Sequence, residues 1–290
     1  MELEKKVLNQ YKMEQKILDW IQSKQNVLDK IIGIAAEDFR FNNQNKNFIY
    51  DCSETSKELW NLGQGKDLCY DRPTIGFIYS LWYHGKRVNT FLRYFFNLIT
   101  QSLDEKYIEI LDLGAGTGAV QWAVGITYAA LKDLNIRTPE IHIINVDSSP
   151  FMLQYNEKYL WEYFVNEFPV CREIKIDYTV NSWTNTEANK ATNIWLSASY
   201  LFDHSENSSE IAIEFEKLIE EHKPNKLLLL SAKPKKYHVD VVANSILQLG
   251  YSNHNQSTSS LLQIYSGNLT YISSKIRKLK KAISLKPLSQ

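Results

Sequence analysis

The chain has 290 residues, 44% of them hydrophobic, and its 33 acidic and 33 basic side chains leave no formal net charge. This length is enough to bury a full hydrophobic core, and zero net charge argues against strong nonspecific binding of nucleic acid. No apolar run approaches the length of a membrane span, and the first residues lack the apolar core of a secretory signal. The three scattered cysteines fit neither a disulfide framework nor a zinc site. We therefore expect a cytoplasmic protein that does not enter a membrane.

Residues 1–68 are predicted to form a helical cap. Apolar side chains recur mostly at three- and four-residue steps from Leu3 to Ile32, with Lys, Glu and Gln between them. The polar run Asn42–Lys46 interrupts this pattern, and another helix is expected over Cys52–Leu62. This part carries no cofactor signature. Two interpretations stay open, namely helices that pack against the core and a lid over a substrate.

An aromatic segment follows, CYDRPTIGFIYSLWY over Cys69–Tyr83. Arg72 and His84 are polar groups in this apolar tract, and a structural hydrogen bond is expected for each, with contact to a substrate as the alternative. Val88–Leu103 is predicted to be the helix that precedes the first strand.

The most specific feature is IEILDLGAGTG, in which a predicted strand runs into a tight turn. Gly114 and Gly116 can take positive φ and leave room for a ligand against the backbone, and Gly118 lets the following helix lie close to the sheet. Asp112 ends the strand two residues before the first glycine. A carboxylate there suits a ligand that carries an ammonium group and hydroxyls, and it repels a pyrophosphate.

A second strand end adds another carboxylate. The apolar helix Ala119–Leu134 leads to the β-branched run Ile141–Val146, which is typical of a buried parallel strand and closes on Asp147. An acidic side chain at this place is able to accept both ribose hydroxyls of a nucleoside cofactor. The run Ser148-Ser149-Pro150 is predicted to begin the next helix, with a serine as cap and the proline in the first turn.

Later elements complete a doubly wound pattern. The predicted strands are Glu173–Val180, Thr192–Ser199, Leu227–Leu230 and a final antiparallel pair, Leu261–Tyr265 and Leu269–Ile272, with helices over Pro150–Phe168, Glu210–His222 and Val239–Leu249. Ligands of such sheets lie beyond the carboxyl ends of the strands. Four polar or aromatic residues fall at four such ends: Asp112, Asp147, Asn181 and Tyr200. We divide the chain into the cap, a nucleotide-binding domain over 69–274 and a basic tail over 275–290.

The motif from Asp112 to Gly118, followed by a strand that ends on Asp147, resembles motif I of the class I S-adenosylmethionine (SAM) methyltransferases. The resemblance implies an α/β, Rossmann-like, mostly parallel seven-stranded sheet with helices on both faces, and SAM as cofactor. It implies that Asp112 and the three glycines hold the methionine half. The remaining cofactor-binding candidates that it implies are Asp147 and Ser148 at the ribose, Asn181, Ser182 and Trp183 at the adenine, and Tyr79 at the sulfonium, with Tyr70 and Tyr83 as alternatives to Tyr79.

The segment after the fourth strand, SASYLFDH, resembles the His-containing pattern of small-molecule methyltransferases and lacks the prolines and amide of enzymes that methylate base amines. Tyr200 and His204 are the catalytic candidates, with His204 as a general base. The alternative for His204 is a surface position on a helix that Asp203 caps. The predicted acceptor is a small molecule or a peptide.

Two other functions stay open. RPTIGFIYSLWY, LDLGAGTGAVQWA and WLSASYLFDHS are also similar to segments of the mitochondrial small-subunit ribosomal methyltransferase-like family, whose cysteine cluster this chain lacks. That similarity would imply binding to ribosomal RNA, with the basic tail on phosphates and without required turnover. An NAD-dependent oxidoreductase is the second alternative, which Asp112 disfavours.

Overall fold

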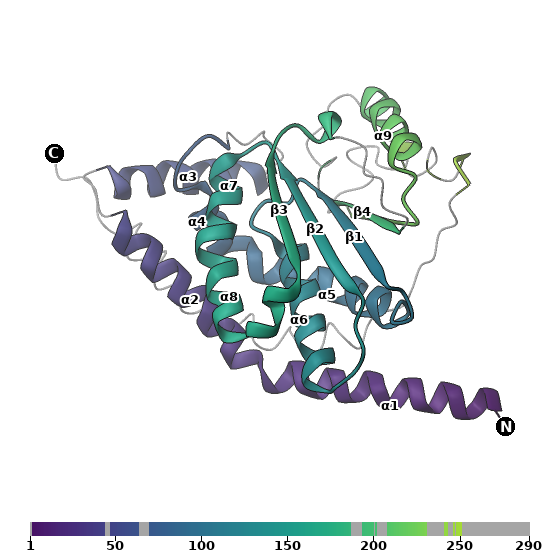
Figure 1. The fold of residues 1–290 in the computed structure, drawn as a ribbon. Helices are drawn as coiled ribbons and strands as arrows, with labels where there is room; N and C mark the ends of the chain where they lie inside the picture. Colours follow the sequence, from purple (N-terminus) through teal and green to yellow (C-terminus); the bar gives the residue numbers. More distant parts are fainter. Residues whose placement is uncertain are drawn as a thin grey trace.

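The computed structural model describes residues 2–43, 47–63, 70–186, 193–199, 208–230, 241–242 and 248–250, together with Leu201 and Ile246. Within them a five-stranded sheet has the order β3-β2-β1-β4-β5, and every neighbouring pair is parallel (Figure 1). The strands are β1 (Tyr107–Leu113), β2 (Glu140–Asp147), β3 (Lys175–Val180), β4 (Ile194–Ser199) and β5 (Lys226–Leu230).

The strand order confirms the α/β class and a Rossmann-like arrangement. The chain runs outward from the central β1 through β2 to β3 and then crosses to β4 on the other side, so the order reverses between β1 and β4. Ligands of open α/β sheets bind at such a switch point, at the carboxyl ends of the strands. The predicted sixth and seventh strands, over 261–265 and 269–272, lie outside the described residues.

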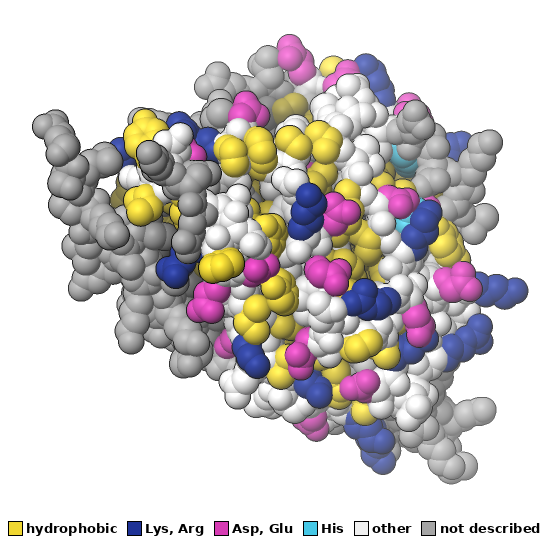
Figure 2. All heavy atoms as spheres, turned by 60° about the vertical axis from the view of Figure 1, so that its left-hand side comes forward, with side chains coloured by type: hydrophobic (Ala, Val, Ile, Leu, Met, Phe, Trp, Pro, Cys, Tyr) yellow, Lys and Arg dark blue, Asp and Glu magenta, His cyan; other side chains and the backbone are white. Residues whose placement is uncertain are grey.

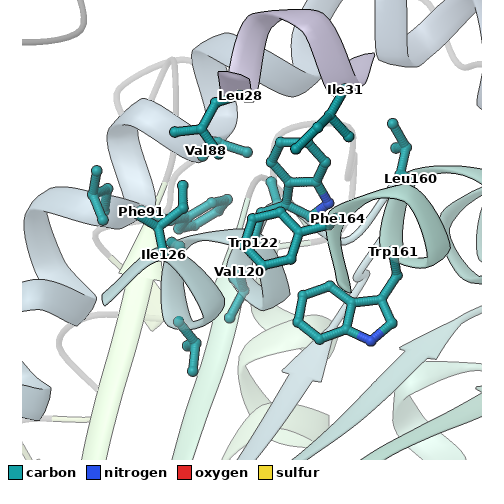
Figure 3. Packing of buried hydrophobic residues seen from close by; sticks show 14 of the residues in the cluster. Leu28, Ile31, Val88, Phe91, Val120, Trp122, Ile126, Leu160, Trp161 and Phe164 are labelled. Carbon is teal, nitrogen blue, oxygen red and sulfur yellow. The ribbon is translucent and has the colours of Figure 1, made fainter. Parts of the chain in front are cut away.

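One face of the sheet is covered by the helices that precede β1, connect β1 to β2 and connect β2 to β3. These helices are α4 (Ile75–Tyr79), α5 (Gly85–Thr100), α6 (Ala119–Asp133), α7 (Pro150–Tyr155) and α8 (Glu162–Glu167). Every residue of α6 from Ala119 to Leu131 is buried, because α6 lies between the sheet, α5 and α1 (Glu2–Ser23). Trp122 of α6 contacts Phe164 of α8 at a centroid distance of 4.8 Å, in the middle of the cluster that Figure 3 shows.

The helices of the predicted cap share this core. Ile17 and Ile21 of α1 are fully buried, and the indole N–H of Trp20 donates a 2.9 Å hydrogen bond to Asp133. Leu28 and Ile31 of α2 (Gln25–Asn42) reach the same cluster (Figure 3). These contacts favour the packing interpretation for α1 and α2, while α3 (Phe48–Gly63) packs against α4.

The opposite face is covered by α9 (Ser208–His222), so helices on both faces are confirmed. Phe215 of α9 packs with Leu111, Leu113 and Val146 in a second apolar cluster. The other described pieces of helical structure are two π-helical turns, Ser80–His84 and Asn156–Trp161, and two 3₁₀ turns, Pro169–Glu173 and Trp183–Asn185.

Charged side chains of both signs are interspersed over the face seen in Figure 2. Among the helices in the described part of the chain, none has both the length and the apolar character that crossing a bilayer requires.

Candidate functional site

The glycine loop between β1 and α6 adopts a conformation that side-chain-bearing residues rarely take. Gly114, Gly116 and Gly118 have φ angles of +69°, +57° and +73°. The N–H groups of Gly114 and Ala115 donate hydrogen bonds of 2.8 and 3.0 Å to the carbonyl of Val146 near the end of β2. The loop is therefore anchored to the neighbouring strand, and the positive φ predicted for Gly114 and Gly116 is confirmed.

The side chains nearest to the three glycines differ. A Cβ on Gly114 would lie 3.3 Å from Leu201, which follows β4, and one on Gly116 would lie 3.3 Å from Met152 of α7. A Cβ on Gly118 would overlap the side-chain amide of Asn156. The prediction assigned Gly118 to close packing between α6 and the sheet, whereas its near neighbour in the structure is the π-helical turn that follows α7.

Asp147 joins this loop to the start of α7. Its Oδ2 accepts the N–H of Gly116 and its Oδ1 accepts the N–H of Ser149, both at 2.8 Å. Burial raises the pKa of Asp147 and the two backbone hydrogen bonds lower it, with burial the larger effect. Each carboxylate oxygen can accept a second hydrogen bond, so the partly exposed group keeps capacity for a diol.

Asp112 lies deeper, at the switch point. It is 2% exposed and stands opposite Asn145 of β2 and Ser197 of β4. Burial raises its pKa to about 8, a hydrogen bond with the Ser197 side chain lowers it, and the charge of Asp147 raises it. The two carboxylates therefore influence each other, which parallel strand ends permit because they meet at one edge of the sheet. Sequence reasoning did not identify Ser197, which only the β1–β4 register places here.

The serine that caps α7 is Ser149, the second residue of the predicted helix start Ser148-Ser149-Pro150. Ser148 is exposed, whereas Ser149 is buried and caps α7, its Oγ accepting the N–H of Met152 at 3.3 Å. The same hydroxyl donates a 2.7 Å hydrogen bond to the carbonyl of Tyr70. Of the three tyrosines proposed to line the cofactor, Tyr70 is thus tied to the end of β2.

Tyr79 and Tyr83 pack against each other at a centroid distance of 5.1 Å and lie partly buried on the core of α4 and the first π-helical turn. No contact described for Tyr79 joins it to the glycine loop. Arg72 makes a 2.7 Å ion pair with Glu58, in keeping with the expected structural role.

The segment after β3 reaches the end of β2. The N–H of Asn181 donates a 3.1 Å hydrogen bond to the carbonyl of Asp147. The Asn181 side chain is used locally, donating to the carbonyl of Asn185 at 3.0 Å and accepting the N–H of Ser182 at 2.8 Å. Trp183 lies edge-on to Phe215 at 6.1 Å, on the α9 side. Contact of this segment with adenine remains a prediction.

The catalytic candidates Tyr200 and His204 lie outside the described residues. Within the described residues, no group of three or more His, Cys, Asp or Glu side chains has an arrangement that would hold a metal ion. His84 is fully buried, with Nδ1 3.0 Å from the Thr117 hydroxyl of the glycine loop, and burial lowers its pKa to about 3. It is a neutral structural side chain, as expected, but its partner in the loop was not foreseen.

The strand order, the positive-φ glycine loop and the two strand-end carboxylates define a Rossmann-like α/β protein with a candidate nucleoside-binding site. No protein-family model matches the chain, and no curated protein sequence matches it.

Solved structures that resemble it include SAM-dependent methyltransferases. One is a candidate SAM-dependent methyltransferase from Methanococcus maripaludis, which is 14% identical with a TM-score of 0.36. The match covers 73% of this chain and 86% of that protein's chain. Another is the plantazolicin methyltransferase BpumL in complex with a monoazolic desmethylPZN analogue and S-adenosylhomocysteine (SAH). It is 14% identical with a TM-score of 0.33, and the match covers 92% of this chain and 80% of the BpumL chain. Both TM-scores lie below 0.5, and both identities lie below 25%.

Proposed function

We propose that this protein is a SAM-dependent methyltransferase that acts on a small-molecule or peptide acceptor. The observation that carries the proposal is the placement of two carboxylates, Asp112 and Asp147, around a loop whose three glycines all have positive φ.

The charge of the site favours SAM over a dinucleotide. Asp112 and Asp147 raise the free energy of each other's ionised form, which is why Asp147 contributes to the raised pKa of Asp112. A ligand with an ammonium and a sulfonium relieves this repulsion, whereas the pyrophosphate of NAD adds to it. With a pKa of about 8, Asp112 is mostly protonated near neutral pH in the ligand-free protein, so a cationic ligand would favour its ionised form and a pyrophosphate would not.

The two carboxylates have different tasks in this proposal. Asp112 and the glycine loop hold the methionine half, and Asp147 accepts the ribose hydroxyls with the lone pairs that Gly116 and Ser149 leave free. The segment Asn181–Trp183 borders the adenine. Bound SAM supplies the methyl group on a sulfonium that is already a good leaving group.

The remaining work of the chain is to orient the acceptor and exclude water. An in-line displacement needs the nucleophile within about 3–3.5 Å of the methyl carbon, and few side chains need to move protons. We assign the acceptor side to Tyr200 and His204, with His204 as general base. Zero net charge favours a small or peptide acceptor over a long nucleic acid.

The test is calorimetric titration of the full chain with SAM, SAH, 5′-methylthioadenosine and NAD. Wild type is expected to bind the sulfur ligands and not NAD. Asp147→Asn should weaken all three sulfur ligands by about ten- to hundredfold, the loss typical of a charged hydrogen bond. Asp112→Asn should weaken SAM and SAH but not methylthioadenosine, which lacks the methionine ammonium.

Glu109→Gln provides the matched control, because Glu109 is a buried carboxylate of the same strand with partners Tyr107 and His142. It should leave all affinities unchanged. Binding of NAD alone would overturn the proposal. The proposal would also be overturned if both Asp112→Asn and Asp147→Asn bound the sulfur ligands as tightly as wild type. Turnover is then tested by incubating the protein and SAM with pools of peptides and small molecules and looking for methylated products. A protein that binds SAM but forms no product would favour the non-catalytic alternative.

A further inference from the structure

Two π-helical turns meet the glycine loop. The first, Ser80–His84, lies between α4 and α5, and the second, Asn156–Trp161, lies between α7 and α8. π-Helical turns are rare, and they often occur at functional sites because the extra residue redirects a side chain. Here the side chains at issue are His84, the last residue of the first turn, and Asn156, the first residue of the second.

His84 holds the loop through its threonine. Its Nδ1 lies 3.0 Å from Oγ1 of Thr117, which stands between Gly116 and Gly118, and both side chains are buried. The imidazole is fixed on another side by Trp122, whose ring it meets at 88° and a centroid distance of 4.8 Å. Because the ring stays neutral, this contact does not depend on pH near neutrality.

Asn156 holds the next residue of the loop. Its amide fills the space where a Cβ of Gly118 would stand, and its Nδ2 donates a 2.8 Å hydrogen bond to Oε1 of Gln121 in the first turn of α6. Asn145 of β2 donates to the same oxygen at 3.0 Å. All three amide side chains are fully buried, so they form a polar layer beneath the loop.

The helices that carry the two turns are in direct contact. A Cβ on Gly76 of α4 would lie 2.5 Å from the Cβ of Tyr155, the residue of α7 that precedes Asn156. Glycine at position 76 therefore lets the two helices approach without an intervening side chain. The result is a rigid support on which both loop-holding residues are mounted.

We propose that His84 and Asn156 are positioning residues that hold the glycine loop in its ligand-binding conformation and so set the affinity for the cofactor. The inference rests on the proposed function, because it takes SAM or SAH as the ligand. Its physical basis is preorganisation: a loop with three glycines has many accessible conformations, and ordering it before binding removes that entropy from the cost of binding.

The test is a double-mutant cycle on the full chain with Thr117→Val and His84→Phe. SAH affinity is measured by calorimetry, and the free energy of unfolding is measured with urea. Each single variant should weaken SAH by about three- to tenfold, as loss of one neutral hydrogen bond predicts. The double variant should be no weaker than either single variant, because both changes remove the same contact. Thr117→Ser keeps the hydroxyl and should restore affinity.

Asn156→Ala tests the second contact and should also weaken SAH. Thr100→Val is the matched control, since it removes a buried hydroxyl that donates to the Phe96 carbonyl 2.8 Å away, at the C-terminal end of α5. It should lower the free energy of unfolding without changing SAH affinity.

Three results would contradict the inference. Variants of Thr117, His84 and Asn156 that lose stability but bind SAH like wild type would show purely structural roles. Additive effects of Thr117→Val and His84→Phe would show that Thr117 contacts the ligand independently of His84. Wild type that fails to bind SAH would overturn the proposed function itself.

Discussion

The main-chain N–H of Gly116 donates a 2.8 Å hydrogen bond to Oδ2 of Asp147, across 31 residues of sequence. The glycine loop after β1 and the carboxylate after β2 are thereby one structural unit. Because Oδ1 of Asp147 accepts the N–H of Ser149, the same side chain also places the start of α7. A ligand held by Asp147 would therefore contact a loop whose conformation Asp147 already determines.

Replacing Asp147 should reduce stability as well as binding. Asp147→Ala leaves the N–H groups of Gly116 and Ser149 without their acceptor, and we expect the free energy of unfolding to fall by about 1–3 kcal/mol. Asp147→Asn keeps one oxygen and should lose less. Urea unfolding of the ligand-free proteins measures the free energy of unfolding of both variants. Equal stability of Asp147→Ala and wild type would mean that solvent replaces both hydrogen bonds at no cost.

Stability should fall as pH rises from about 6.5 to 8. The pKa of Asp112 is raised to about 8 from an ordinary 3.8, so over this range the folded state holds a proton that the unfolded state has lost. The raised pKa of Asp147 acts in the same direction. We expect a decrease of about 1–2 kcal/mol in the free energy of unfolding, and Asp112→Asn should remove most of it.

Below pH 6.5 a second group opposes this trend. The pKa of buried His84 is lowered to about 3 from 6.5, so below pH 6.5 the unfolded state holds an extra proton at His84 and its contribution to stability rises with pH. This contribution offsets the falling contribution of Asp112, so the wild-type profile should be nearly flat in the acidic range and fall above pH 6.5. Urea titrations at pH 5, 6, 7 and 8 separate the two groups, because His84→Phe changes only the acidic part of the profile. A wild-type profile that rises steadily up to pH 8 would contradict the raised pKa of Asp112.

Two glycine substitutions should have opposite effects. Gly118→Ala adds a Cβ at a φ of +73° and against the amide of Asn156, so we expect a loss of about 1–3 kcal/mol. Gly33→Ala, in α2, has no atom within 4 Å of the added Cβ and should stabilise the protein by up to about 1 kcal/mol. Thermal unfolding of the two variants measures both changes in stability. A Gly118→Ala protein as stable as wild type would contradict the close approach of Asn156.

The N-terminal helix should be needed for stability. Ile17 of α1 is fully buried in the main core, and Ile17→Ala should lower the free energy of unfolding by about 2–4 kcal/mol. Ile34→Ala is the control, because Ile34 of α2 is 36% exposed and should cost much less. If Ile17→Ala and Ile34→Ala lowered the free energy of unfolding equally, α1 would not be part of the core. The predicted boundary at residue 68 would then separate two independent units.

The elements around the glycine loop were predictable from the sequence because their signals are local. Positive φ selects glycine, a buried parallel strand selects β-branched and apolar residues, and the strand ends at the first polar side chain. Asp112 and Asp147 were named in this way and lie at the carboxyl ends of β1 and β2, and Gly114, Gly116 and Gly118 lie in the loop from β1 to α6. The five described strands lie where the pattern predicted them, within about two residues at each end.

The partners of these residues depended on the tertiary structure. Ser197 meets Asp112 only through the register of β4, and Thr117 meets His84 only because a π-helical turn without a sequence signature directs the imidazole inward. Trp183, named for the adenine, packs edge-on to Phe215 because α9 contacts the 3₁₀ turn that follows β3.

The sequence by itself therefore determined the backbone of the site, since the conformational limits of each residue act within a few positions. Only the fold decided which buried polar groups support it, because those hydrogen bonds join residues 24 to 85 positions apart: Gln121 with Asn145, and Asp112 with Ser197. Contacts of this kind follow from register and helix packing, which single-residue preferences do not encode.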